Sequence, residues 1–351
     1  MDFEIKDGVL VKYNGSNPDI IIPSDVTAID VNAFINNKFL KSVIITENVT
    51  VIGAGAFSEC ANLEKITISE GVTKINAFAF SECANLKKIV IPEGVTIISE
   101  SAFENCCNLE KIVIPEGVTT IGDSAFKNCY NLKKIVIPNS VTTIGDLAFC
   151  DCYNLEKIVI PESVTEIGGS AFACTEWLEN KTATEKNFVA VNGIVIQAAD
   201  EDNIEESVNL EGIKEIKGYI FWGFAQIKEF VIPDGLKIGD SAFVTENDFN
   251  ICLKHDDFSV NIQINKSEMI KDKVKFTERT ESLFKFIGAG TEQRELLFDN
   301  LELPEYRYPI AVFMANAYKS EFFHTFVNVH FEKIIQYAEN NDPDLLKLIS
   351  R

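Results

Sequence analysis

The apolar positions of this chain recur with a period of 23 residues over its first half. The clearest series is a column of phenylalanines, each preceded by alanine: Phe34, Phe57, Phe80, Phe103, Phe126, Phe149 and Phe172. A repeat of this length is typical of a solenoid, because a single unit cannot bury its own apolar face without its neighbours. The pattern therefore predicts a stack of short coils, each carrying one phenylalanine.

Residues 132–154 illustrate the expected fold of one coil. The β-branched residues at its start favour a short strand, in which Leu132, Ile135 and Ile137 face inward and the residues between them face solvent. Pro138 is expected to end this strand.

The second part of the coil returns the chain to the core. Val141 and Ile144 are expected to point inward, and Gly145 is expected to relax the backbone at a turn. Asp146 then stands where it would cap a short helical turn that carries Phe149. Burial of one phenylalanine contributes roughly 1.5 to 3 kcal/mol, so the phenylalanine column is expected to be the spine of the core.

Five cysteines repeat in the same phase: Cys60, Cys83, Cys106, Cys129 and Cys152. Inward-pointing side chains of one column seldom have disulfide geometry, so these residues are predicted to be reduced core thiols. Cys107, Cys150, Cys174 and Cys252 lie off the column, and an odd total argues against a full disulfide framework. A zinc site is not indicated, because C-x-x-C spacing is absent.

An asparagine column also follows the period, at Asn62, Asn85, Asn108, Asn131 and Asn154. One interpretation is a functional polar ladder. The favoured interpretation is structural, because asparagine satisfies backbone groups at turns and a stacked turn repeats the same need.

The units share the pattern N-L-x-K-I-x-I-P-x-x-V-T-x-I-G-x-x-A-F, which resembles the bacterial leucine-rich repeats of the BspA-like family. The resemblance is close over residues 20–174 and loose over residues 213–243. It implies an α/β repeat solenoid, a curved right-handed superhelix with a parallel sheet on one face. Such proteins are usually associated with protein binding or surface adhesion, although a fold alone does not determine function.

Changes in pattern divide the chain into four regions. They are an N-terminal hairpin cap (1–19), regular leucine-rich repeats (20–175), an insertion with degenerate repeats (176–262) and a helical C-terminal domain (263–351). The two predicted hairpins turn at Asp7-Gly8 and Asn192-Gly193, both strong hairpin signals.

Helical spacing begins at about residue 265. Apolar residues recur at intervals of three and four near residues 278–287, 291–301, 306–319 and 321–340. Asp342-Pro343 would begin a last helix. The helical domain is expected to cap the open end of the solenoid, since solenoids need polar caps.

The formal net charge of −21 argues against general nucleic-acid binding, because a phosphate backbone would be repelled. No apolar run reaches 18 residues, so membrane insertion is not expected. Acidity favours basic partners but identifies none.

Packing does not dictate the outward strand positions, which form two uniform columns. One is a lysine ridge and the other a β-branched stripe, and together they are the candidate binding residues: Lys65, Lys88, Lys111, Lys134, Lys157, Thr67, Val90, Val113, Val136 and Val159. The β-branched stripe begins one coil earlier, at Ile44. Beside the ridge, the residue before each lysine alternates in sign, from Lys41 and Glu64 to Lys133 and Glu156.

Two explanations of these columns remain open. Repeat duplication would produce them if valine serves β-propensity and lysine discourages aggregation. The functional hypothesis is that the sheet face binds an extended or acidic protein surface, with the valines giving contact and the lysines steering.

Catalysis is not indicated. No G-x-S-x-G, P-loop, H-E-x-x-H or dinucleotide fingerprint is present, and the histidines are only His255, His324 and His330. The last two are six residues apart, which does not place them on one helical face. No cofactor, metal or catalytic residue is therefore expected.

The sequence thus favours a non-enzymatic protein-protein interaction module, with surface adhesion as one form of this function. One alternative is a carbohydrate-binding surface protein, for which Trp177 and Trp222 are the candidate platforms. The other is a cytoplasmic scaffold that uses the helical tail. No secretory signal follows Met1, so the chain as written is expected in the cytoplasm, whereas the resemblance implies the cell surface.

Overall fold

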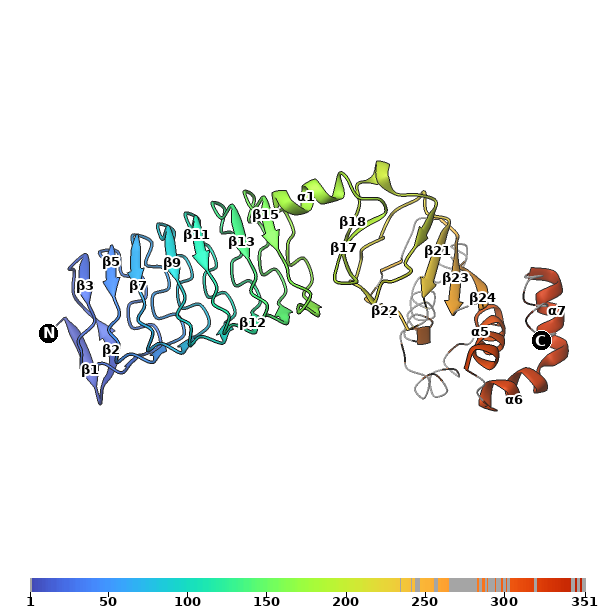
Figure 1. Ribbon diagram of the computed structural model, residues 1–351, viewed down its shortest axis with the longest axis horizontal. Helices are drawn as coiled ribbons and strands as arrows, with labels where there is room; N and C mark the ends of the chain where they lie inside the picture. Colours follow the sequence, from blue (N-terminus) through green and yellow to red (C-terminus); the bar gives the residue numbers. More distant parts are fainter. Residues whose placement is uncertain are drawn as a thin grey trace. The chain divides into compact units, whose positions relative to one another are not determined.

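Figure 1 shows the computed structural model of the chain. It describes residues 2–233, 235–240, 242–243, 247–255, 258–264, 304–318 and 321–341, with scattered positions between 283 and 301 and at 345 and 348. Two compact units are present, Met1–Lys181 and Thr182–Arg351. The first is a stack of coils with parallel strands, which confirms the predicted solenoid.

The first unit opens with the predicted hairpin, β1 (Phe3–Lys6) and β2 (Val9–Tyr13). The coils then contribute one strand each to the face predicted to bind: β3 (Asp19–Ile21), β5 (Ser42–Ile44), β7 (Lys65–Thr67), β9 (Lys88–Val90), β11 (Lys111–Val113), β13 (Lys134–Val136) and β15 (Lys157–Val159). A second row of two-residue strands follows on the opposite side: β4 (Ala28–Ile29), β6 (Val51–Ile52), β8 (Lys74–Ile75), β10 (Ile97–Ile98), β12 (Thr120–Ile121), β14 (Thr143–Ile144) and β16 (Glu166–Ile167).

In the paired strands from β3 to β16, each residue lies in register with the residue 23 positions later. Lys88 pairs with Lys111, and Thr120 pairs with Thr143. Residues 23 positions apart in the sequence therefore lie side by side in these sheets, so a repeated outward residue forms a column on the surface.

The phenylalanine column is the spine of this unit, as predicted. From Phe34 to Phe172 neighbouring ring centroids are 4.7–5.7 Å apart and the ring planes lie within 2–11° of parallel. Tyr13 of the N-terminal hairpin covers one end of the column, 5.3 Å from Phe34. Trp177 of α1 (Glu176–Thr182) packs edge-on against Phe172 at 5.3 Å, so it closes the other end.

The prediction that each phenylalanine lies on a short helical turn is wrong. Residues 146–151 form turns, and Leu147 and Asp151 have φ of 56° and 59°, which is incompatible with a right-handed helix. Phe149 N donates to Ala171 O at 2.7 Å, so the segment bonds to the next coil. Asp146 also acts between coils, because its Oδ1 accepts from Gly169 N at 2.6 Å.

The role predicted for Gly145 also needs correction. Its φ is not in the left-handed region, so the residue is not needed for conformational freedom. A Cβ at this position would lie 2.5 Å from Asp123 N of the preceding coil. The glycine is required because two backbones approach closely.

The cysteine column consists of buried thiols, as predicted, and none of the nine cysteines is in a disulfide. Each column thiol donates to a phenylalanine carbonyl 26 residues earlier, at 3.1–3.3 Å. Burial raises the pKa of Cys60 and of Cys152 to about 12. These thiols are therefore packing groups and are poor nucleophiles.

The asparagine column has the structural role predicted, with one difference. Asn62 Nδ2 donates to Lys38 O at 2.7 Å, which satisfies a backbone group as expected. In the middle of the column the side chains bond to one another, because Asn131 Nδ2 donates to Asn108 Oδ1 at 3.0 Å.

The second unit begins with the other predicted hairpin, β17 (Phe188–Val191) and β18 (Ile194–Ala198), which is followed by the short 3-10 helix η1 (Glu201–Asn203). Its further strands are β19 (Ser207–Asn209), β20 (Glu215–Ile216), β21 (Glu229–Pro233), β22 (Lys237–Ile238), β23 (Phe249–His255) and β24 (Phe258–Ile264). Helix α5 (Pro304–Tyr318) packs against β24, the last strand of its sheet. Helix α5 therefore lies beside the edge strand of this sheet, the position expected for a cap.

The helical prediction is confirmed where the structure describes it. The segment predicted at 306–319 is α5, and the one at 321–340 is two helices, α6 (Glu321–Val329) and α7 (Phe331–Asn341). They are separated at His330, whose Nδ1 lies 3.0 Å from Phe326 O. Most of the segments at 278–287 and 291–301, and the start of the last helix at Asp342-Pro343, lie outside the described residues.

The stacked ring column predicts a large effect of truncation. Phe103→Ala should lower the free energy of unfolding by about 3–5 kcal/mol, because a fully buried ring leaves a cavity between two coils. Phe39→Ala, at a ring that is 57% exposed, is the control and should change it by about 0.5 kcal/mol or less. Urea unfolding measures both, and equal losses would contradict the spine.

Candidate functional site

The outward residues of β3–β15 form one continuous face of the first unit. All ten predicted binding residues lie there, since the flanking positions of β7, β9, β11, β13 and β15 are exposed and the central position faces the core. The valines are 44–54% exposed. Their exposure shows that core packing does not select them, while their role in binding stays a prediction.

The stripe is longer than predicted. It begins at Ile21, one coil before the predicted start at Ile44, and these two side chains are 61% and 42% exposed. The lysine ridge begins only at Lys65, because this column holds Asp19 and Ser42 in the first two coils; Asp19 pairs in register with Ser42, and Ser42 pairs with Lys65. The 23-residue register alone is sufficient to find Ile21.

An acidic column borders the stripe on the side away from the lysines, and it was missed in the sequence interpretation. Its exposed members are Glu47, Glu70, Glu93, Glu116 and Glu162, and the other two coils have Ser24 and Asn139 at this position. The repeated Pro-Glu-Gly tripeptide could have indicated it. The β-branched stripe therefore runs between a cationic and an anionic ridge.

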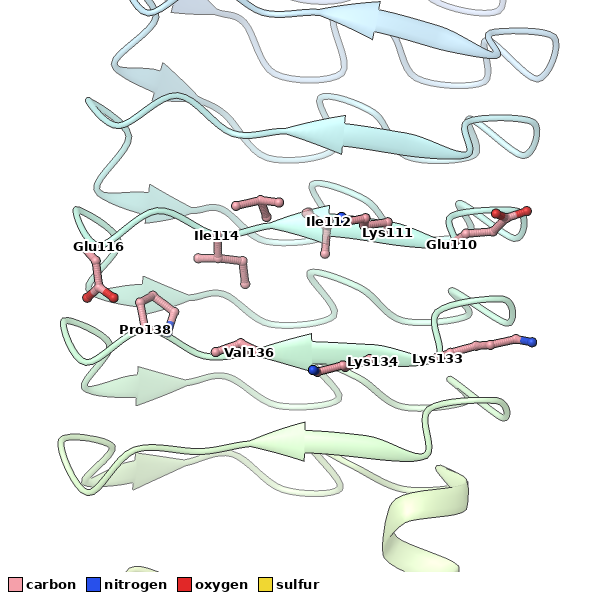
Figure 2. A pocket seen from close by; sticks show the side chains of 10 residues that line it. Glu110, Lys111, Ile112, Ile114, Glu116, Lys133, Lys134, Val136 and Pro138 are labelled. Atoms are coloured by element: carbon pink, nitrogen blue, oxygen red, sulfur yellow. The ribbon is translucent and has the colours of Figure 1, made fainter.

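The face is hollowed in two places. A hollow of about 530 Å³ lies between β11 and β13, and one of about 420 Å³ lies between β7 and β9. In Figure 2, Glu110 and Lys133 lie at one end of the larger hollow, Glu116 and Pro138 at the opposite end, and Val136 between them. The lysine ridge and the stripe thus meet at both hollows.

Both hollows coincide with interruptions of the strand ladder. Among the described strands, β11 and β13 are not hydrogen-bonded neighbours, and β7 pairs with β9 only at Lys65 and Lys88. Other junctions are closed, as where Ile45 N donates to Thr67 O at 2.9 Å and Ile137 N donates to Val159 O at 3.0 Å. The sheet is therefore open at every second coil along this stretch.

Positive charge is concentrated on this face. Eight of the fourteen lysines in residues 1–181 lie on the ridge or directly before it: Lys41, Lys65, Lys87, Lys88, Lys111, Lys133, Lys134 and Lys157. None of these eight forms an ion pair with another described residue. Their ammonium groups are therefore available to an external anion.

Other candidate chemistry finds little support in the described part of the chain. No group of three or more His, Cys, Asp and Glu that could hold a metal is found among those residues. His255 lies in β23 and His324 in α6, while His330 stacks on Phe326 with centroids 4.1 Å apart. No described helix is both long and apolar enough to cross a membrane.

The two tryptophans differ in their suitability as sugar platforms. Trp177 is half-buried against Phe172, so its ring serves the core. Trp222 is 62% exposed, close to Tyr219, which is 64% exposed. Only the second site offers open aromatic faces.

Parallel coils with columns of leucine, isoleucine and phenylalanine define a leucine-rich repeat protein. The family profile described as a BspA type leucine rich repeat region (6 copies) matches residues 12–133, 96–192 and 119–252. The chain therefore belongs to the BspA type leucine-rich repeat family.

Several solved bacterial structures are similar to the chain. A T. pallidum leucine-rich repeat protein is 29% identical, with 48% of this chain and 81% of that chain covered and a TM-score of 0.47. One from Bacteroides ovatus is 24% identical (68% and 64% covered, TM-score 0.43). A leucine-rich cell surface protein from Faecalibacterium prausnitzii is 22% identical (70% and 90% covered, TM-score 0.31). No curated protein matches the sequence.

Because the stripe is exposed, replacing valine by the isosteric threonine should cost less stability on the stripe than at a buried position. Val113→Thr on the face should change the free energy of unfolding by about 0.5 kcal/mol or less. Val118→Thr, at a fully buried position of the same coil, should lower it by about 1–3 kcal/mol because a hydroxyl is desolvated. Urea unfolding compares them, and a large loss at Val113 would show that packing selects the stripe.

Proposed function

We propose that this chain is a non-enzymatic protein-interaction module that binds its partner through the outward face of β3–β15. The observation that carries the proposal is an exposed apolar stripe next to lysines that form no ion pair with any described residue. The valines supply apolar contact area, and the lysines raise the rate of encounter with an acidic surface.

The opposite row of strands provides an internal comparison. Its outward positions are chemically mixed: Ala28, Val51, Lys74, Ile97, Thr120, Thr143 and Glu166. The stripe is β-branched in every coil from Ile21 to Val159. Duplication of one ancestral coil would leave both columns equally uniform, and β-propensity acts on both. The difference therefore favours a requirement that acts on the β3–β15 face alone.

Surface adhesion is the form of this function that we favour, because BspA-like repeats are usually associated with adhesion. An intracellular scaffold that uses helices α5–α7 is the competing form. The two differ in the compartment of the partner and in the part of the chain that binds it. Capture from an extracellular-matrix extract and from a cell lysate, done in parallel, separates them.

Charge reversal on the face should abolish capture without unfolding the protein. The double variant Lys111→Glu/Val113→Glu should retain no partner in a pull-down, because it removes one ridge cation and fills the larger hollow with carboxylates. Its melting temperature should equal that of the parent chain, since both residues are exposed.

Lys74→Glu/Ile97→Glu is the matched control on the opposite row of strands. It makes the same changes in charge and in apolar surface at exposed residues of β8 and β10. Capture by this control should equal that of the parent. If both double variants capture normally, or both fail, the proposed face is wrong.

A further inference from the structure

The two hollows are equivalent sites displaced by two coils. Eight of the nine residues that line the smaller hollow have a counterpart 46 positions later in the larger one. Seven of the eight pairs are identical in type, and the remaining pair is Thr67 and Val113. A ligand that fits one hollow therefore fits the other, and a repeating ligand could occupy both.

Each hollow combines an apolar floor with three lysines. Ile112 and Ile114 line the larger one beneath Lys111, Lys133 and Lys134. The smaller has Ile66 and Ile68 with the corresponding three lysines, Lys65, Lys87 and Lys88. Glutamates also border them, Glu110 and Glu116 at the larger hollow and Glu64 at the smaller, so lysines outnumber carboxylates at both. This chemistry suits an apolar group that has an anion beside it.

Backbone groups at the hollows lack the coil-to-coil bonds made elsewhere. Where the ladder is closed, Ile45 N donates to Thr67 O and Ile137 N donates to Val159 O. The equivalent bonds from Ile68 N to Val90 O and from Ile114 N to Val136 O are not made in the described structure. A partner with free backbone N–H and C=O groups would meet this need, whereas the backbone of an α-helix is already paired.

The distance between the hollows selects the conformation of such a chain. Paired strands lie about 4.7–4.9 Å apart, so two coils span roughly 10 Å. A polyproline II chain returns to the same face every three residues, after about 9.3 Å. A β-strand returns to the same face every two residues, after about 6.7 Å and again after about 13.4 Å, and neither distance matches the separation of the hollows.

We propose that the β3–β15 face binds an acidic polyproline II segment of a partner protein that runs across the strands. Apolar side chains three positions apart occupy the two hollows, and carboxylates next to them meet the two lysine triads. This inference rests on the proposed function and specifies its partner.

Fluorescence anisotropy with short synthetic acidic peptides tests this. The probe carries two leucines three positions apart with glutamate and proline between them, and the control peptides have the same composition with the leucines two or four apart. The full chain should bind the probe about tenfold more tightly than either control, since a misplaced anchor loses its pocket. Equal affinity for the three peptides would overturn the proposal.

Variants locate the binding. Thr67→Glu/Val136→Glu places a carboxylate in each hollow and should weaken probe binding about tenfold or more, while Lys74→Glu/Ile97→Glu should leave it unchanged. If the hollow variant binds normally, or if a uronate polysaccharide binds and displaces the probe more strongly than acidic peptide does, the peptide assignment is wrong. Capture that still depends on Lys111 and Val113 would then leave the broader function intact.

Discussion

The structure of the first unit depends on in-register pairing of each coil with the next. Because the offset is constant at 23 residues, a side chain at one position repeats the environment of its predecessor. The phenylalanine rings stack, the column thiols donate to phenylalanine carbonyls, and the outward lysines and valines are aligned by this one constraint. A coil has little structure of its own, so stability and surface chemistry both arise between coils.

Sequence periodicity was sufficient to predict the features that in-register pairing repeats from coil to coil. The phenylalanine spine, the buried cysteines, the two Asx-Gly hairpins and the exposed columns were predictable because each recurs or has a strong local signal. The helical turn was not, because a short apolar run does not reveal that Leu147 adopts a φ of 56° or that Phe149 bonds to the next coil. The hollows also escaped prediction, since β11 and β13 at an open junction have the same Lys-Ile-Val sequence as β13 and β15 at a closed one.

The open junctions between coils create distinct sites on a face whose residue columns are otherwise uniform. A regular sheet with valine and lysine columns would present a featureless surface, on which a ligand could slide from coil to coil. Interruption of the ladder between β7 and β9 and again between β11 and β13 creates two concave sites at a defined separation. Concavity, apolar floors and an excess of lysines over carboxylates then coincide at the same residues, and concave, mostly apolar sites with a few polar groups are typical of binding sites.

Site-specific photocrosslinking tests the central claim that this face meets the partner. A benzophenone side chain would be placed at Val113 on the face, at Ile97 on the opposite row of strands, and at Phe322 on α6, all exposed positions. After capture from matrix extract or lysate and irradiation, the account predicts a covalent adduct from Val113 alone. An adduct from Ile97 or Phe322 with none from Val113 would contradict it.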